Sequence, residues 1–580
     1  MIQNNYFSDN PDLMLHFEKL INWQEVIQEY EAEFEDAKKY KETGLASLEM
    51  APSSLSEAID YYHEVLSLIG ELCGNKVSAH IADFEAEGLH YSDGKVKHPE
   101  KMAELIHSFH ESGLVAASFK REYGGMGLTQ VAKTLLLEMA YRCDTSFAVA
   151  MGSVNLASIL QDFATEEQKQ RIIPKLIQER YSVTMGLTEP NFGSDLAAVQ
   201  TRAELKEGQW YISGTKRFQT MACGLNGDPA AILCLARTGS PTSGAKGLSF
   251  FLVDSKHYEI AGLEKKMGLK TSATCEVVLD KSPAELLGQQ GYGLTRYVMG
   301  MLNGARMSVA AQGVGIATAA YEEARKYASE RTQFAKTLEK IPVIHNILNR
   351  MQREIAGMRS LMLEAARTVD LYAWRSLRGK SEGRDEKELR KDSHIQFWNS
   401  ISSTITPLAK YYNAEMANTI CYDAIQIFGG AGFCEDYEVA RLYRDVRIAT
   451  IWDGTSQIQV NAAIGAVQTG LSGKGPFSQY LQDKLNKIKP SIELLEIFKN
   501  CKYLAELYKK LEPEKREISS EYLILSVSRF LIGLLYEEQE TKLDSEEILE
   551  TRRAWRKEFN IETLAKVESF LRIMNYSIGS

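Results

Sequence analysis

The sequence predicts a multidomain α+β protein in which helical, β, helical and again helical regions follow one another along 580 residues. Apolar residues recur at helical spacing as far as about residue 180. Short β-prone runs then replace them, and long helical patterns return at about residue 293. At roughly 100–200 residues per domain, a chain of this length forms about three to five compact units.

The first helical region begins with a recognisable start signal. Asn10 and Pro11 suit an N-cap and a first helical position, and Leu13, Phe17 and Leu20 follow at helical spacing. Small residues and a proline then predict a linker before the helical pattern resumes, with short breaks at 91–94 and 122–127. We therefore divide this part of the chain into an N-terminal extension at 1–50 and a helical domain at 51–181.

A change of period marks the second region. The β-prone runs are separated by Gly, Asn, Asp and Ser, and lie at 182–187, 209–213, 230–236, 248–254 and 275–279. They predict a middle β domain at 182–290.

Helical patterns longer than those of typical globular helices follow, as expected of a helical bundle at 291–470. They cover 294–333, 343–377 and 387–428, and a further helix is expected to begin at Thr455. The run LSGKGPF then predicts a linker to an appended helical domain at 471–580. Its most apolar stretch, 522–536, contains Arg529 and predicts a buried helix, and no apolar run reaches membrane-spanning length.

Composition excludes several classes of function. A net charge of −10 and a pI near 5.7 argue against a general polyanion binder, and 471–580 holds 18 basic and 18 acidic residues. The eight cysteines form no CxxC pair, and His107 and His110 have no recognisable third ligand, so we expect no metal. The N-terminal residues lack a secretory signal, and we expect a cytoplasmic protein with reduced thiols.

Three segments contain residues suited to ligand contact. Residues 185–195 run from a strand end into a loop of Thr, Pro, Gly and Ser, which is also typical of a β-turn. Residues 426–433 are rich in glycine, which allows close backbone approach but also ends helices. In 451–457, Asp453 follows Trp452; an acid against apolar walls has a raised pKa suited to a general base, whereas a helix cap is the structural alternative.

Together with four further runs, these segments resemble the acyl-CoA dehydrogenase family over about residues 50–470. The matching runs, in family order and spacing, are TMGLTEPNFGSDLAAVQTRAE, YISGTKRFQT, MGLKTSATCEVVLD, NGARMSVAAQGVGIA, ERTQFAKTL, QIFGGAGF and RLYRDVRIATIWDGTSQIQ. The resemblance implies an N-terminal helical domain, a middle β domain and a C-terminal four-helix bundle, with FAD between the last two. The longer ends are similar to the larger bacterial members, including the branch typified by 3-methylmercaptopropionyl-CoA dehydrogenase.

The resemblance also implies the site residues. Those expected to contact FAD of the same subunit are Met185, Leu187, Thr188, Phe218, Thr220, Thr455 and Gln457. Those expected to reach the FAD of a neighbouring subunit, and hence to imply a homodimer, are Arg331, Gln333, Phe334, Gln426, Gly429 and Gly430. Those expected to contact the acyl-CoA are Ser194, Asn303, Arg306, Trp452 and Gly454.

The family reaction is α,β-dehydrogenation of an acyl-CoA thioester, in fatty acid metabolism and β-oxidation, with electrons passing to an electron-transferring flavoprotein. The resemblance implies that Asp453 is the base that removes the α-proton. The family usually has Glu at this position, and the other family base position is Ala305 here. Asp is about 1.5 Å shorter than Glu, so the alternatives are a catalytically weak flavoprotein, related to the DNA-associated branch with its basic C-terminal region, and an acyl-CoA oxidase.

Overall fold

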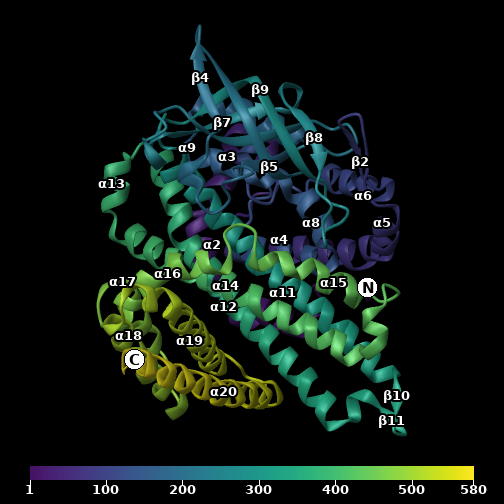
Figure 1. Ribbon diagram of the computed structural model, residues 1–580, viewed down its shortest axis with the longest axis vertical. Helices are drawn as coiled ribbons and strands as arrows, with labels where there is room; N and C mark the ends of the chain where they lie inside the picture. Colours follow the sequence, from purple (N-terminus) through teal and green to yellow (C-terminus); the bar gives the residue numbers. More distant parts are fainter. Residues whose placement is uncertain (580) are drawn as a thin grey trace. The chain divides into compact units, whose positions relative to one another are not determined.

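The computed structural model describes residues 1–579, which form two compact units (Figure 1). The first unit consists of residues 1–6 and 31–305, and the second of residues 7–30 together with the chain from 306 onward. Helix α11 (Met299–Glu330) begins in the first unit and continues into the second. The N-terminal extension is therefore divided between the two units, and the five sequence domains stay a prediction.

The first unit combines helices with one large sheet. Its helices are α3 (Glu35–Thr43), α4 (Leu55–Glu71), α5 (Ile81–Glu87), α6 (Glu100–Glu111), α7 (Gln130–Cys143), α8 (Thr145–Gly152), α9 (Leu160–Phe163) and α10 (Glu166–Gln178). Its strands are β1 (His90–Ser92), β2 (Lys95–Lys97), β3 (Ser182–Gly186), β4 (Arg202–Lys206), β5 (Gln209–Thr220), β6 (Ala230–Arg237), β7 (Leu248–Asp254), β8 (Glu259–Leu263) and β9 (Thr274–Leu287).

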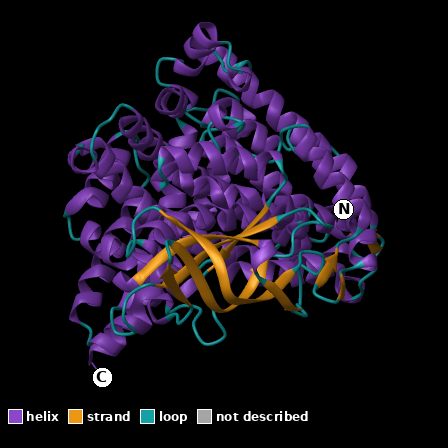
Figure 2. Ribbon diagram, turned by 90° about the horizontal axis from the view of Figure 1, so that it is seen from above, coloured by secondary structure: helices purple, strands orange, loops and turns teal. Residues whose placement is uncertain are grey.

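In the seven-stranded sheet, whose strands are orange in Figure 2, β6 pairs with three others. Strand β6 pairs with β3 in parallel and with β7 antiparallel, and the pairings β6–β7–β9–β5–β4–β6 close a ring. Alternate residues of β6 enter two different apolar clusters, Leu233 on one face and Ile232 on the other. Burial on both faces explains why the run AAILCLA is continuously apolar rather than alternating.

Within the seven-stranded sheet, the sequence missed two strands and shortened two others. Strands β4 and β8 lack alternation because their residues are largely exposed and β8 pairs only with β9. Strands β5 and β9 continue well beyond the predicted runs because each pairs with the other over most of its length. The predicted helix break at 91–94 is the turn of the hairpin formed by β1 and β2.

The second unit is almost entirely helical. Its elements are α1 (Pro11–Leu15), α2 (Trp23–Glu31, whose last residue lies in the first unit), the rest of α11, β10 (Thr332–Gln333), β11 (Lys336–Thr337), α12 (Pro342–Ser381), α13 (Glu386–Lys391), α14 (Ser393–Phe428), α15 (Glu438–Val446), α16 (Ser456–Leu471), α17 (Gly475–Asn486), α18 (Ile492–Lys510), α19 (Pro513–Glu540) and α20 (Glu546–Gly579). Asn10 caps α1 as predicted, with its side chain accepting from Leu13 N.

Buried polar contacts hold the bundle together. Asn413 of α14 donates to Ala310 O of α11 and to Met358 O of α12, each at 3.2 Å, and is fully buried. The predicted helix at 387–428 is in fact two helices, because Asp392 caps α14 by accepting from the backbone N–H groups of His394 and Ile395. A capping side chain next to a good helical sequence is hard to distinguish from a helix interior by periodicity alone.

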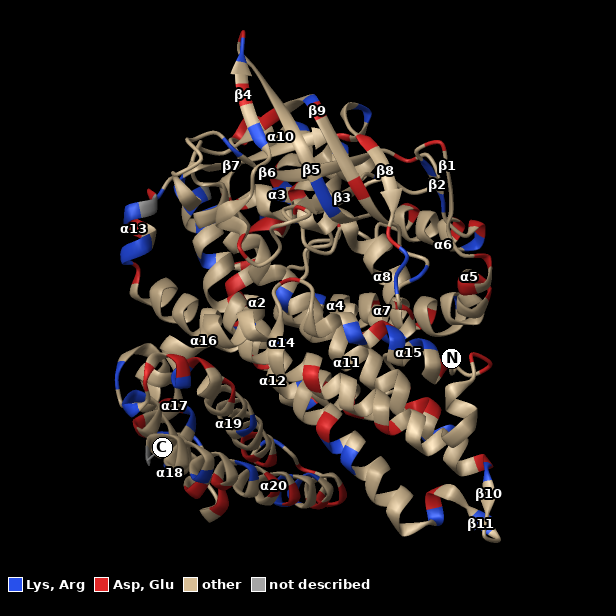
Figure 3. Cartoon of the chain, in the orientation of Figure 1, with Lys and Arg blue, Asp and Glu red and all other residues tan. Residues whose placement is uncertain are grey.

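The appended helices α17–α20 pack on α12, α14 and α16. Helix α19 is long and apolar enough to cross a membrane by length and composition, but 78% of its most apolar window is buried inside the structure, as expected of a core helix. Lys and Arg are interspersed with Asp and Glu along α18 and α20, and no single-sign face is visible there (Figure 3).

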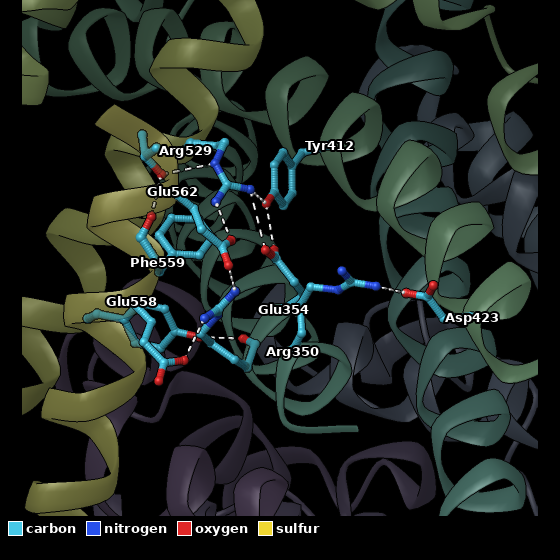
Figure 4. A network of polar contacts seen from close by, with 11 residues as sticks. Arg350, Glu354, Tyr412, Asp423, Arg529, Glu558, Phe559 and Glu562 are labelled. Carbon is cyan, nitrogen blue, oxygen red and sulfur yellow. Dashed lines mark hydrogen bonds and ion pairs between the residues drawn. The ribbon is translucent and has the colours of Figure 1, made fainter. Parts of the chain in front are cut away.

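A buried polar cluster, which we call the Arg529 network, joins α19 and α20 to the bundle (Figure 4). The Arg529 guanidinium donates to Tyr412 Oη and Thr563 Oγ1, each at 2.9 Å, and contacts Glu354 Oε1 at 3.4 Å. Tyr412 in turn donates to Glu354 Oε2 at 2.7 Å. The aromatic partner of Arg529 is Phe559, whose ring centre lies 4.0 Å from the guanidinium carbon.

Arg353 extends the Arg529 network along α20. Its guanidinium donates to Glu558 Oε2 at 2.8 Å and to Glu562 Oε1 at 2.7 Å, and Glu562 also pairs with Arg529 at 3.6 Å. Burial alone would lower the pKa of each arginine, but the surrounding acidic groups outweigh it and raise both pKa values. The charged forms are thus favoured, as expected of a structural ion cluster.

Candidate active site

The predicted base lies on a short loop of the second unit, between the 3₁₀ turn Arg447–Thr450 and helix α16. Thr455 is the N-cap of α16, and its side chain accepts from Ile458 N at 3.4 Å. The alternative interpretation of Asp453 as the cap is therefore wrong. Asp453 and Gly454 both have positive φ, 52° and 88°, so an L-residue adopts an unfavourable backbone here.

Two side chains from different helices hold this loop. Gln459 Nε2 of α16 donates to Asp453 O at 3.2 Å and to Gly454 O at 2.8 Å. Lys410 Nζ of α14 donates to the same Gly454 O at 2.8 Å. The carbonyl next to the predicted base therefore has two donors, and the strained loop is fixed by the bundle.

The charged groups around Asp453 are poorly stabilised in their ionised forms. Burial raises the pKa of Asp453 to about 6, although Lys410 and Arg306 act in the opposite direction. Burial also lowers the pKa of Lys410 to about 8 and lowers that of Arg306, while Asp453 opposes both shifts. A carboxyl with a pKa close to neutrality is well matched to proton transfer.

Trp452 packs beside this carboxylate on the bundle. Its indole Nε1 donates to Gln312 Oε1 of α11 at 3.2 Å, and its ring contacts the small cluster formed by Val309, Ala414 and Ala449. Since an indole N–H can only donate, the hydrogen bond also fixes the orientation of the Gln312 amide. The bulky side chain predicted to shape the acyl pocket is thus held in one position.

In the first unit, Met185 and Gly186 end β3, and the loop that follows them is fixed by a buried ion pair. Lys216 Nζ donates to Leu187 O at 3.1 Å and to Glu189 Oε1 at 2.9 Å. Glu189 also accepts from the backbone N–H groups of Gln200 and Thr201, at 2.7 and 2.9 Å. The segment is therefore fixed by buried contacts, and it also contains the tight turn given as the alternative, since Glu189 and Phe192 exchange backbone hydrogen bonds.

Phe218 lies next to this loop in an irregular part of β5. The neighbouring Arg217 N donates to Thr188 O at 3.0 Å, and the register between β5 and β9 shifts between Lys216 and Gln219. Phe218 has a φ of 61° and is 54% exposed, so a strained backbone presents an aromatic face to the outside of the unit. Strain of this kind persists only where the surroundings enforce it, which makes it a mark of a functional position.

Thr220 completes this group at the end of β5. Its hydroxyl lies 3.4 Å from Thr274 Oγ1 and is half-buried, as is Thr188. An exposed aromatic face beside two threonine hydroxyls suits a planar ring that carries both donors and acceptors. The residues present therefore fit an isoalloxazine.

Two predicted neighbour-contacting segments come together at one end of the bundle. The turn between β10 and β11 carries Phe334 at φ 51° with 87% of its side chain exposed, and Arg331 and Gln333 are also exposed. Tyr327, one turn before Arg331 on α11, stacks on Phe428 with ring centres 4.1 Å apart. The stack places this turn next to the exposed residues Gln426, Gly429 and Gly430.

The remaining predicted residues lie on three different segments of the chain. Ser194 is exposed in the loop after β3, Asn303 is half-buried on the first-unit part of α11, and Gln457 is exposed in the first turn of α16. His107, one of the two histidines without a third ligand, lies 2.6 Å from Asp228 Oδ2 through its Nε2. Sequence reasoning missed Lys410, although a lysine within the apolar run ITPLAKYY is a signal that could have found it.

Comparison with known proteins identifies the family. The chain matches the N-terminal domain model of acyl-CoA dehydrogenases at residues 64–180, the middle domain model at 184–282, and the C-terminal domain model at 291–378 and 389–467. The 3-methylmercaptopropionyl-CoA dehydrogenase of Ruegeria pomeroyi is 32% identical over 443 residues, which cover 70% of this chain and 72% of the relative.

Solved structures agree with this result. The butyryl-CoA dehydrogenase of Megasphaera elsdenii is 28% identical, with a TM-score of 0.59 over 70% of this chain and 98% of its own. The fold of an acyl-CoA dehydrogenase from Bacillus anthracis, solved with FAD, matches with a TM-score of 0.73 over 90% of this chain and 89% of its own, at 23% identity. That match extends well beyond the part of this chain matched by the Megasphaera enzyme and the family models. The chain therefore belongs to the acyl-CoA dehydrogenase family, whose members are FAD-dependent oxidoreductases.

Proposed function

We propose that the protein is an FAD-dependent dehydrogenase that converts an acyl-CoA thioester to the trans-2-enoyl-CoA with Asp453 as the general base. The observation that carries the proposal is the carboxyl itself, held on a fixed loop with a pKa raised by burial to about 6. At neutral pH such a group is mostly ionised, yet it accepts a proton more readily than an ordinary aspartate.

Bound FAD would accept the β-hydrogen of the substrate as hydride at its N5 position. Thr188, Phe218 and Thr220 would hold the isoalloxazine in the first unit, the hydroxyls by hydrogen bonds and Phe218 by its exposed ring. In the second unit, Thr455 and Gln457 would contact FAD through the start of α16. These assignments follow the family pattern and are supported by the fixed backbone around Thr188 and the strain at Phe218.

Asp453 would remove the α-proton of the thioester. Its reach is about 1.5 Å shorter than that of the family glutamate, and Trp452, pinned by Gln312, narrows the space beside it. A substrate whose α-carbon lies closer to the loop would compensate for the shorter reach of Asp453 and would fit the narrower space beside Trp452. Arg306, 5% exposed and close enough to influence the titration of Asp453, would contact the CoA portion.

Anaerobic mixing of the FAD-loaded enzyme with a panel of acyl-CoAs tests the proposal. We expect the flavin absorbance to bleach with at least one member, and a panel of different chain lengths and branching then gives the preferred acyl group. Failure of every acyl-CoA to bleach the flavin contradicts the proposal and favours a catalytically weak flavoprotein. Steady-state assays with an electron-transferring flavoprotein and with oxygen separate a dehydrogenase, which forms little peroxide, from an oxidase.

We also propose a homodimer. The second unit exposes Phe334 and Phe433 at 87% and 89%, close to the predicted neighbour-contacting segments. Large exposed aromatic side chains of this kind mark an interaction surface. Light scattering should therefore give at least a dimer, and the double substitution of Phe334 and Phe433 by Ser should shift it towards monomer with loss of FAD. A stable FAD-loaded monomer of the parent would contradict this.

A further inference from the structure

Lys410 has no role in the chemistry described so far, yet it lies at the base. It is completely buried in the middle of α14, and its neighbours Leu408 and Ala409 are buried apolar residues. A buried ammonium group is costly unless it is paired and hydrogen-bonded. The proton transfer needs only one group to accept the α-proton, so a second buried titratable group requires an explanation of its own.

Its hydrogen bond is made to the backbone that presents the base. Nζ donates to Gly454 O at 2.8 Å, and Asp453 itself has a φ of 52°. A non-glycine residue with positive φ costs of order 1–3 kcal/mol and persists only where its surroundings enforce it. A charged donor supplies a stronger hydrogen bond than a neutral one and is therefore suited to hold this loop.

We propose that Lys410 is the positioning residue of Asp453: its ammonium group fixes the Gly454 carbonyl and so aims the carboxylate, and its positive charge keeps that carboxylate ionised. The inference rests on the proposed role of Asp453 as the base. It adds a residue on which both the geometry and the protonation of the base depend.

The other groups around the base do not replace this role. Gln459 donates to the same carbonyl at 2.8 Å but carries no charge. Arg306 on α11 carries a positive charge that acts to lower the pKa of Asp453. Glu415 on α14 accepts a hydrogen bond from Ser456 Oγ, and its negative charge acts to raise the pKa of Lys410. Lys410 combines a positive charge with a hydrogen bond to the loop carbonyl Gly454 O.

The titration of Lys410 follows from its burial. Burial lowers its pKa to about 8, so above this pH the amine becomes neutral and Asp453 loses part of its electrostatic support. Below about pH 6 Asp453 itself becomes protonated. The rate of flavin reduction should therefore have an acidic and an alkaline limb, of which Lys410 controls the alkaline one directly and the acidic one through its charge.

Four variants separate these effects in the FAD-loaded enzyme. Lys410→Met keeps the length of the side chain without charge or donor, and Lys410→Arg keeps the charge. Gln459→Leu is the matched control, because it removes the other bond to Gly454 O and leaves the charges unchanged. Lys484→Met removes a lysine of α17 from its buried ion pairs with Glu364 and Glu538 and controls for general destabilisation.

Stopped-flow flavin reduction across pH gives the decisive profile. Lys410→Met should lower the maximal rate by about 10–100-fold, raise the acidic limb by about one pH unit or more, and lose the alkaline limb near pH 8. In Lys410→Arg the acidic limb should return to the pH of the parent enzyme. Gln459→Leu should lower the rate and leave the acidic limb at the same pH. An acidic limb unchanged in Lys410→Met, or moved equally in Lys484→Met, would overturn the proposal.

A second readout does not depend on turnover. The infrared carbonyl band of protonated Asp453, assigned by its loss in Asp453→Asn, should titrate at a higher pH in Lys410→Met than in the parent. An unmoved band overturns the role of Lys410 even if no acyl-CoA reduces the flavin, so the two proposals fail separately. If Asp453→Asn retains flavin reduction and Lys410→Met abolishes it, Lys410 is itself the base and its assignment as a positioning residue is wrong.

Discussion

Two clusters of buried charge lie in the second unit, and their electrostatics are opposite. In the Arg529 network every arginine has acidic partners, and the pKa values of Arg353 and Arg529 are raised. Around Asp453 the carboxyl pKa is raised, and the Lys410 pKa is lowered. The first cluster favours its charged forms, whereas the second disfavours them.

The difference lies in how many partners each charge has. The Arg529 guanidinium has a hydroxyl, a phenol and two carboxylates around it, and an aromatic ring covers its face. The hydrogen bonds that Gln459 and Lys410 donate to the Asp453 loop instead reach backbone carbonyls, Asp453 O and Gly454 O. A cluster in which each arginine has at least two acidic partners contributes to structure, while a carboxyl with a near-neutral pKa is suited to proton transfer.

The largest effect should come from Asp453→Asn. Amide replaces carboxylate at almost equal volume, so FAD and acyl-CoA binding should survive while flavin reduction falls by about 10²–10⁴-fold, the typical contribution of a general base. Stopped-flow absorbance and a binding titration measure the two properties. Reduction at the parental rate would mean that the base lies elsewhere.

Next in size, Arg529→Met should destabilise the fold. Removing Arg529 takes one positive partner away from Glu354 and from Glu562 inside a buried ion cluster, although Arg353 still pairs with Glu562, and the expected cost is about 3–5 kcal/mol. Urea denaturation measures the free energy of unfolding. Arg572→Met, at an exposed position of α20, is the control. The rate of flavin reduction per folded enzyme should be unchanged, and a selective loss of rate would erase the distinction between the two clusters.

A moderate effect concerns pH. Because the base must be ionised, kcat/KM should rise as pH increases through about 6 in the parent enzyme. The folded pKa of Asp453 lies above its unfolded value, so its contribution to stability is full at low pH and is lost as pH rises through about 6. Asp453→Asn should therefore gain stability relative to the parent at about pH 8 but not at about pH 4; equal differences at both values would contradict the raised pKa.

The smallest effect should come from Thr563→Val. This change removes the hydroxyl that accepts from Arg529 Nε at 2.9 Å and donates to Phe559 O at 2.7 Å, at nearly constant volume. The expected loss is about 1–3 kcal/mol, because a charged donor is left without that acceptor. Calorimetry measures it, and Thr551→Val, at an exposed position of the same helix, is the matched control. No difference between the two variants would show that the network is more adaptable than its geometry indicates.

Much of this protein is legible in local sequence. The run AAILCLA predicts a strand, and Asn10 with Pro11 predicts a helix start, because these signals depend on nearest neighbours. The ordered motifs around Thr188, Arg306 and Asp453 identify the acyl-CoA dehydrogenase family, and with it the class of cofactor. Strands β4 and β8 were missed because sheet pairing, not apolar periodicity, makes them strands.

Only the tertiary structure decided which charges meet. The sequence shows Lys410 as one lysine in a helix, and the fold places its Nζ on the carbonyl beside the base. Equally, the apolar stretch 522–536 predicts that Arg529 lies on a buried helix, but its partners are decided only when α19 packs on α12 and α14. A pKa depends on burial and on charges brought in from other helices, and both arise only when the chain is packed. The sequence by itself thus determined the family, the order of the helical and β regions and the choice of Asp453 as the candidate base. Packing decided the environment of the Asp453 carboxyl.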